Sequence, residues 1–156
     1  MAAGRIEARL RKLGIALPEP AAPLANYVPF TVENGLVVVS GQIPMRLGQI
    51  AYTGKLGHAV SVEDGQAAAR LCLVNVLAQL RAACDGDLDR VRRVLRLGGF
   101  IAAAPEFTEH ARVMNGASDL AVEVFGEAGR HARSTIGVPS LPSDAAVEVE
   151  GLFAIG

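Results

Sequence analysis

The residues best suited to chemistry lie near the C-terminus, where Arg133 precedes a Leu141-Pro142 turn and Glu148 follows it. The guanidinium of arginine presents a planar set of donors that can hold a carboxylate through two parallel hydrogen bonds. A glutamate nearby can position or deprotonate a water molecule. The pair therefore predicts a site for a small carboxylate-bearing molecule, although the same two residues could also form an ordinary structural or surface ion pair.

Metal and disulfide chemistry are not indicated. The histidines, His58, His110 and His131, are scattered and show no ligand spacing with the cysteines. Cys72 and Cys84 fall in one predicted helix about 18 Å apart, so they cannot pair within it. Cys72 is most simply a small core residue. His131 could add a positive charge beside the predicted anchor or be an exposed loop residue.

Composition limits the class of partner. A chain of 156 residues is typical of one domain, and a net charge of -1 does not favour nucleic acid. Hydrophobic residues make up 51% of the chain, which predicts that a partner covers some apolar surface. No leader or long apolar run is found, and we expect a cytoplasmic protein with no membrane partner. The basic run at residues 90–96 is more typical of a solvated strand edge than of a nucleic-acid groove.

The N-terminal half predicts an arm followed by a hairpin. Residues 4–13 have the spacing of a short amphipathic helix, and the proline-rich stretch 18–26 predicts an extended linker. We therefore divide the chain into an N-terminal helix and linker (1–26) and one domain (27–156). Asn34-Gly35 between two β-rich runs suits a type I′ turn. A second short turn over residues 46–48 leads to a third predicted strand, IAYTG, at residues 50–54.

The remaining pattern predicts an α+β fold. Ser61 and Asp64 have capping-box spacing before a long helix ending near Ala83, and a second helix is predicted over residues 108–125. A strand is predicted over residues 91–101. The last strand alternates strictly, which places Glu148 on the face opposite its apolar residues. The order β-β-β-α-β-α-β predicts one mixed sheet with both helices on a single face, so the opposite face needs a cover and favours self-association.

Several short segments, read together, resemble a known family. They are Tyr27-Val28, SGQIP at residues 40–44, ARS at residues 132–134, Leu141-Pro142 and VEVE at residues 147–150. Their order and spacing resemble the reactive-intermediate deaminase family (RidA, or YjgF-like), over most of the chain from residue 27 onwards. The resemblance implies a chorismate mutase-like fold and a homotrimer with ligand pockets in the clefts between subunits.

The resemblance also implies an activity. Typical members hydrolyse small enamines and imines, such as 2-aminoacrylate, to 2-keto acids and ammonia without a cofactor. Arg133 matches the arginine that grips the substrate carboxylate, and Glu148 matches the glutamate that orients the attacking water. Tyr27 and Gly41 match pocket-lining positions, although from the residues alone Tyr27 could be a packing residue and Gly41 a site of backbone bending.

This chain departs from the family pattern at the predicted pocket. His131 stands where the family usually has proline, and Thr135 replaces a frequent pocket cysteine. The segment before residue 125 is longer than usual, so the family's pocket asparagine could correspond to Asn115, to Asp119 or to neither. The altered wall motivates an alternative function, namely non-catalytic binding or sensing of small carboxylic acids such as keto acids. Names such as endoribonuclease, often given to relatives, find no support in these residues.

Overall fold

The fold is described from a computed structural model that covers residues 4–20, 22 and 25–156. The strands are β1 (Phe30–Glu33), β2 (Leu36–Gln42), β3 (Met45–Arg46), β4 (Gln49–Ile50), β5 (Val91–Ala102), β6 (Ala132–Val138) and β7 (Val147–Ile155). The α-helices are α1 (Arg5–Lys12), α2 (Val62–Ala83) and α3 (His110–Phe125). Three short 3₁₀ helices are η1 (Leu88–Arg90), η2 (Gly126–Gly129) and η3 (Pro142–Asp144).

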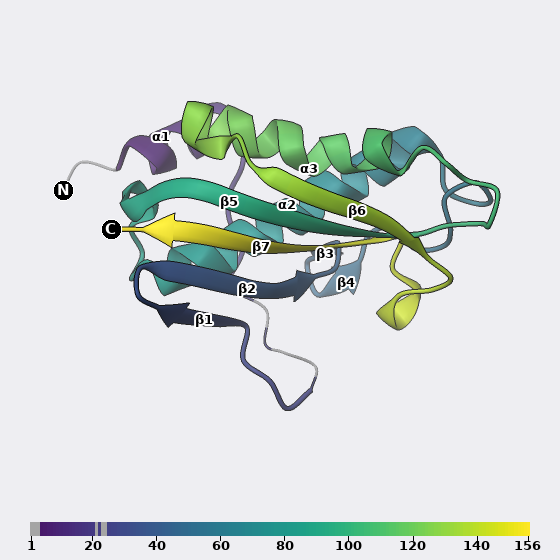
Figure 1. The fold of residues 1–156 in the computed structure, drawn as a ribbon, viewed down its shortest axis with the longest axis horizontal. Helices are drawn as coiled ribbons and strands as arrows, with labels where there is room; N and C mark the ends of the chain where they lie inside the picture. The colour runs from purple at the N-terminus through teal and green to yellow at the C-terminus, as the bar shows by residue number, and fades with distance from the viewer. Residues whose placement is uncertain (1–3, 21, 23–24) are drawn as a thin grey trace.

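Five strands form one mixed sheet in the order β1-β2-β7-β5-β6, and β5 and β6 are its parallel pair. Helix α2 packs against β2 and β7, while α3 packs against β5 and β6. Both long helices therefore cover one face of the sheet, with α1 beside α3 (Figure 1). The predicted α+β class, the mixed sheet and the placement of two helices on one face are confirmed, and β6 adds a parallel edge strand to the predicted order.

The turns and caps form where the residue types predict them. Asn34 and Gly35 both have positive φ, at 51° and 75°, as a type I′ turn requires, and Leu47 and Gly48 repeat this pattern between β3 and β4. Ser61 caps α2 by accepting a hydrogen bond from the backbone N–H of Asp64 at 3.1 Å. These local signals fix the register of β1 against β2 and the start of α2.

The core lies between the sheet and its helices. In β7 every second residue is buried, and the buried apolar members are Val147, Val149, Phe153 and Ile155. Glu148 and Glu150 occupy the alternate positions, as predicted. The only free cysteines of the described chain, Cys72 and Cys84, are both buried, and Cys72 belongs to this core. No helix in the described part of the chain is long and apolar enough to cross a membrane.

The prediction of a third strand, IAYTG, at residues 50–54 is wrong. Only Ile50 of that segment is in a strand, and β4 pairs with β3 in a separate two-stranded sheet. Residues 51–54 instead bond to the segment before β7, through Ala146 N–H to the Tyr52 carbonyl at 3.0 Å and Gly54 N–H to the Asp144 carbonyl at 3.0 Å. The hairpin pairs only Met45 with Ile50 and Arg46 with Gln49, so residues 51–54 lie beyond its ladder.

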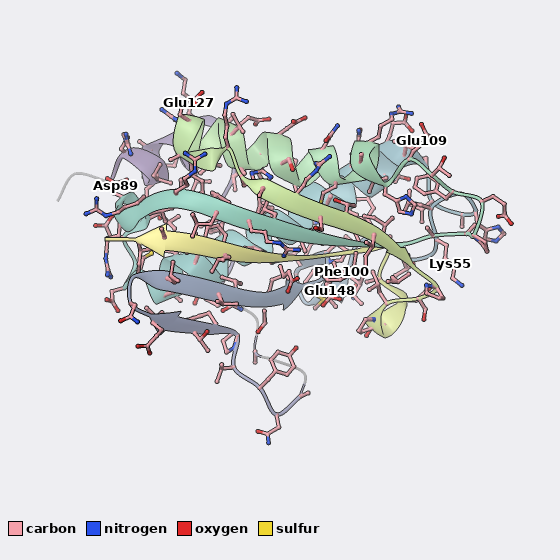
Figure 2. The ribbon with its side chains drawn as sticks, in the orientation of Figure 1. Lys55, Asp89, Phe100, Glu109, Glu127 and Glu148 are labelled. Carbon is pink, nitrogen blue, oxygen red and sulfur yellow. The ribbon has the colours of Figure 1, made fainter. Side chains whose placement is uncertain are left out.

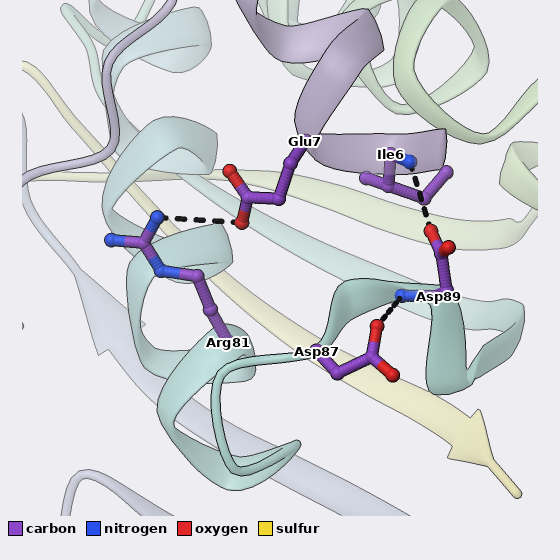
Figure 3. A network of polar contacts seen from close by, with 5 residues as sticks. All are labelled: Ile6, Glu7, Arg81, Asp87 and Asp89. Carbon is purple, nitrogen blue, oxygen red and sulfur yellow. Dashed lines mark hydrogen bonds and ion pairs between the residues drawn. The ribbon is translucent and has the colours of Figure 1, made fainter. Parts of the chain in front are cut away.

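The N-terminal helix docks onto its own chain. Ile6 and Leu10 are buried, as the amphipathic spacing predicts. Figure 3 shows Asp89 of η1 facing the start of α1, where its carboxylate accepts the backbone N–H groups of Ile6 at 2.8 Å and Arg5 at 2.9 Å. Asp89 thus supplies the cap that Gly4 does not. The predicted linker includes residues 21, 23 and 24, which lie outside the described residues, and the division of the chain at residue 27 stays a prediction.

Replacing Asp89 with alanine should release α1. Two N–H groups at the start of the helix would lose their acceptor, and a lost cap costs about 1 kcal/mol. The two N–H donors hold the pKa of Asp89 below its ordinary value, Ile6 more strongly than Arg5. The stabilisation is therefore complete above the unfolded pKa and is lost as the pH falls through the lower folded pKa. Amide hydrogen exchange of Ile6 measures both effects, and unchanged exchange in the variant would show that α1 docks without this cap.

Candidate functional site

Arg133 lies on β6, the edge strand, and faces the helices. It stands in register with Leu97 of β5, which in turn stands opposite Gly151 of β7, and both of these neighbours are buried. Its guanidinium donates from Nη1 to the Ser118 hydroxyl at 2.9 Å and from Nη2 to the Ala111 carbonyl at 3.2 Å. No carboxylate of the described residues forms an ion pair with it. The positive charge of Arg133 is therefore held in place but not neutralised.

The residue of α3 that reaches Arg133 is Ser118. Asn115 and Asp119, the two predicted candidates, make no hydrogen bond or ion pair with Arg133. Ser118 and Ala111 are seven residues apart on the helix, which places them on the same side two turns apart. His131, for which a place beside the anchor was one of two alternatives, bonds to the Ser118 hydroxyl through Nε2 at 2.9 Å. Ser118 was missed because nothing in the sequence sets the rotation of α3 relative to β6.

Thr135 follows Arg133 on the same side of β6. Its partner in register is Gly99 of β5, which faces the helices against Met114. The hydroxyl oxygen of Thr135 is buried and makes no hydrogen bond to a described residue. Thr135 therefore lies on the same side of β6 as Arg133, and its part in substrate binding stays a prediction.

Glu148 lies on β7 and faces the opposite, helix-free side of the sheet. It stands opposite Phe100 of β5, which is in register with Ile136 of β6, and Figure 2 shows Phe100 and Glu148 close together near the start of β7. Glu148 lines a cavity of about 300 Å³ whose wall also includes the predicted residues Tyr27 and Gly41. The other lining residues are mostly apolar; they are Ala22, Pro29, Gln42, Ile43, Met45, Gly48, Ile50, Pro142 and Ser143.

The carboxylate of Glu148 is placed to stay partly protonated at a higher pH than an ordinary glutamate. Burial raises its pKa, and the like charge of Glu150, two residues along the same face, raises it further. Glu150 has its own partner, Arg96, at 3.8 Å. No described residue donates a hydrogen bond to Glu148. A half-buried carboxylate without a donor is well suited to accept a proton or to bind water.

Asn75 of α2 holds part of the wall of this cavity in place. Its side-chain amide donates to the carbonyls of Ile43 at 3.2 Å and Met45 at 3.0 Å. Both of these residues line the cavity. Asn75 is buried, so these bonds tie the segment between β2 and β3 firmly to the helix beneath it.

Gly41 is required for the position of the Glu148 carboxylate. A Cβ atom on residue 41 would lie 2.5 Å from Oε1 of Glu148 and 2.9 Å from its carboxyl carbon. Gly41→Ala should therefore displace the carboxylate while the fold remains, because the side chain of Glu148 can move. We expect a roughly 10- to 100-fold loss of kcat in any reaction that uses Glu148, with an unchanged melting temperature. Unaltered kinetics would show that the carboxylate does not act from this position.

The predicted residues thus form two groups on opposite faces of the sheet. Arg133 and Thr135 lie on the helix side of the edge strand, whereas Tyr27, Gly41 and Glu148 surround the cavity on the open side. The alternative of an Arg133–Glu148 ion pair within one chain is therefore excluded. No group of three or more His, Cys, Asp or Glu residues in the described chain could hold a metal ion.

Comparison with known proteins decides the family. A family model described as "YjgF/chorismate mutase-like, putative endoribonuclease" matches residues 7–155. The chain belongs to the YjgF family. This confirms the resemblance carried by the SGQIP, ARS and VEVE segments and gives the α+β fold its chorismate mutase-like class. The match also includes most of α1, which the resemblance did not cover.

Three relatives of this YjgF family member extend over nearly its whole length. Protein TCP17 of Trypanosoma cruzi is 50% identical over 156 residues, covering 99% of this chain and 97% of the relative. The crystal structure of Atu1372 from Agrobacterium tumefaciens, a protein of unknown function, is 52% identical with a TM-score of 0.91, covering 97% of this chain and 92% of that one. A "putative endoribonuclease" from Shewanella oneidensis MR-1 is 39% identical with a TM-score of 0.94, covering 97% and 100%.

Proposed function

We propose that this protein hydrolyses small enamine and imine intermediates of the 2-aminoacrylate type to 2-keto acids and ammonia, at a site completed by two subunits of a homotrimer. One observation carries the proposal: an arginine without an acidic partner and a half-buried glutamate without a donor lie on opposite faces of one sheet. Each is suited to half of the reaction. A neighbouring subunit can bring the two halves together.

The open face of the sheet supports self-association. No element of the described chain covers it, and its apolar residues remain accessible, with Val38 50% and Ile136 51% exposed. Leu152 stands opposite Val38 on the same face. Exposed apolar side chains on an uncovered sheet face are more typical of a subunit interface than of a monomer surface.

The residues provide a plausible course for the reaction without a cofactor. Arg133 binds the substrate carboxylate and fixes the position of the adjacent imine carbon. Protonation of the imine nitrogen makes that carbon electrophilic, and Glu148 of the neighbouring subunit directs a water molecule onto it. The carbinolamine that results then expels ammonia and leaves the 2-keto acid. The cavity beside Glu148 is apolar enough to hold a small substrate side chain.

The activity is tested by generating 2-aminoacrylate in situ with a serine or threonine dehydratase and following ammonia and pyruvate release. We expect the protein to accelerate release well beyond spontaneous hydrolysis. No acceleration at any protein concentration would overturn the proposed reaction. Buried, unpaired Cys72 and Cys84 fit a reducing compartment, and we place the protein in the cytoplasm, with neither nucleic acid nor membrane as a partner.

A second candidate function is binding or sensing of a small carboxylic acid without turnover. The surroundings of Arg133 favour this binding function, because the α3 side chain that contacts Arg133 is Ser118 rather than Asn115 or Asp119. Calorimetry with 2-ketobutyrate, pyruvate and benzoate distinguishes the two functions. Binding that depends on Arg133 and occurs without any acceleration of hydrolysis would support the binding protein.

A further inference from the structure

Three polar groups join Arg133 to the start of its own strand. The Ser118 hydroxyl accepts a hydrogen bond from Arg133 Nη1 at 2.9 Å and contacts His131 Nε2, also at 2.9 Å. The other ring nitrogen, Nδ1 of His131, lies 2.6 Å from the Gly129 carbonyl. Ser118 lies on α3, Gly129 on η2 and Arg133 on β6, and His131 lies in the connection between η2 and β6.

The hydrogen positions in this series follow from its partners. A carbonyl oxygen can only accept, so Nδ1 of His131 carries a hydrogen and donates it to Gly129. In the neutral ring Nε2 is then an acceptor, and the Ser118 hydroxyl donates its hydrogen there. This leaves the lone pairs of Ser118 for Arg133. In this tautomer of the neutral ring, Arg133 donates to Ser118, Ser118 donates to His131 and His131 donates to Gly129.

We propose that Ser118 and His131 form a positioning relay that fixes the guanidinium of Arg133 in the orientation in which it takes a carboxylate. The relay rests on the proposed role of Arg133 as the anchor. A free arginine side chain loses much rotamer entropy when it binds a ligand, and a prior hydrogen bond to a fixed acceptor removes part of that loss. Nη1 and Nη2 each use one donor within the chain, which leaves three of the five N–H groups for a ligand.

Close packing at Gly129 keeps the far end of the relay rigid. A Cβ atom at this position would overlap the Ala121 carbonyl of α3, so η2 can lie directly against the helix only with glycine there. Gly129 is buried, and its carbonyl is therefore presented to His131 at a fixed place. Ala121, which contacts Gly129, and Ser118, which contacts Arg133, belong to one helix. Both Gly129 and Arg133 are therefore held by α3.

The test measures 2-ketobutyrate binding to the intact oligomer by calorimetry, together with KM and kcat for imine hydrolysis. Ser118→Ala should raise the dissociation constant and KM on the order of tenfold, with kcat within about twofold. His131→Phe should act in the same direction. His131→Gln, whose side-chain oxygen can accept near the Nε2 position, should restore binding. Glu127→Gln, which weakens the exposed pair with Arg130 beside the relay, is the matched control.

A double-mutant cycle distinguishes a failure of the relay from a failure of Arg133 as the anchor. In an Arg133→Ala background, Ser118→Ala should change binding by less than about twofold, because the relay acts through the guanidinium. An equal loss of affinity from Ser118→Ala in both backgrounds would overturn the relay and leave the anchor intact. The same holds if neither relay variant loses affinity while Arg133→Ala abolishes binding. Unchanged binding in Arg133→Ala itself would instead overturn the anchor. The melting temperatures of the variants exclude simple unfolding.

Discussion

Arg133→Ala is expected to lower kcat/KM for imine hydrolysis by roughly 100-fold or more, because the charged donor that holds the substrate carboxylate is lost. The folded state should be little affected, since Arg133 has no ion pair and its two bonds inside the chain go to neutral groups. Arg133→Lys should recover only part of the activity, because an ammonium lacks the planar fork of donors. Steady-state kinetics with 2-aminoacrylate generated in situ measure both variants.

The matched control is Arg130→Ala, which removes a neighbouring, more exposed arginine that is paired with Glu127 at 3.0 Å. It should leave kcat/KM within about twofold, since rim charges contribute little. An Arg133→Ala protein as active as the control would remove Arg133 from the site. Circular dichroism would show whether a loss of activity comes from unfolding or from loss of the arginine in a folded protein.

Glu148→Gln is expected to lower kcat by about 100-fold or more, the usual effect of losing a general base, with a much smaller change in substrate binding. The acidic limb of the wild-type pH profile should lie above the ordinary glutamate pKa, because burial and Glu150 both raise the pKa of Glu148. Activity that needs the carboxylate form therefore falls as the pH drops through this raised value. Glu150→Gln removes one cause and should shift the limb to lower pH.

A pH profile that does not respond to Glu150→Gln would separate the acidic limb from Glu148. Full activity in Glu148→Gln would exclude any role of the carboxylate in the reaction. The kinetics of Glu148→Gln should be compared with those of Gly41→Ala, which keeps the carboxylate and only displaces it. If both variants lose kcat and keep their affinity for 2-ketobutyrate, the carboxylate acts in the chemical step.

The elements with strong local patterns could be predicted from the sequence. Asn34-Gly35 specifies a turn that few residue pairs can adopt, and the alternation of β7 fixes which face Glu148 occupies. The face of Arg133 could not be predicted in this way. β6 has no alternating apolar pattern, and its parallel pairing with β5 depends on long-range contacts. Long-range contacts also decide that Ser118 of α3 reaches Arg133 and that residues 51–54 bond to the segment before β7 instead of forming a strand.

The resemblance to a family supplied the candidate residues, and the fold shows how they are distributed. Arg133 and Glu148 were expected at one cleft, and they lie on opposite faces of the same sheet within a chain. A cleft between subunits can hold both residues although they lie on opposite faces within one chain. We therefore expect each active site to take its arginine from one subunit and its glutamate from the next.

Mixed oligomers of Arg133→Ala and Glu148→Gln subunits test this arrangement of the active site. Each variant alone is expected to be nearly inactive. If a cyclic oligomer forms by random mixing of equal amounts, about one quarter of the sites will combine an intact Arg133 with an intact Glu148 from the neighbouring subunit. The mixture should therefore recover about one quarter of wild-type activity. Mixed oligomers that are verified by native mass spectrometry and show no activity above either parent would contradict it.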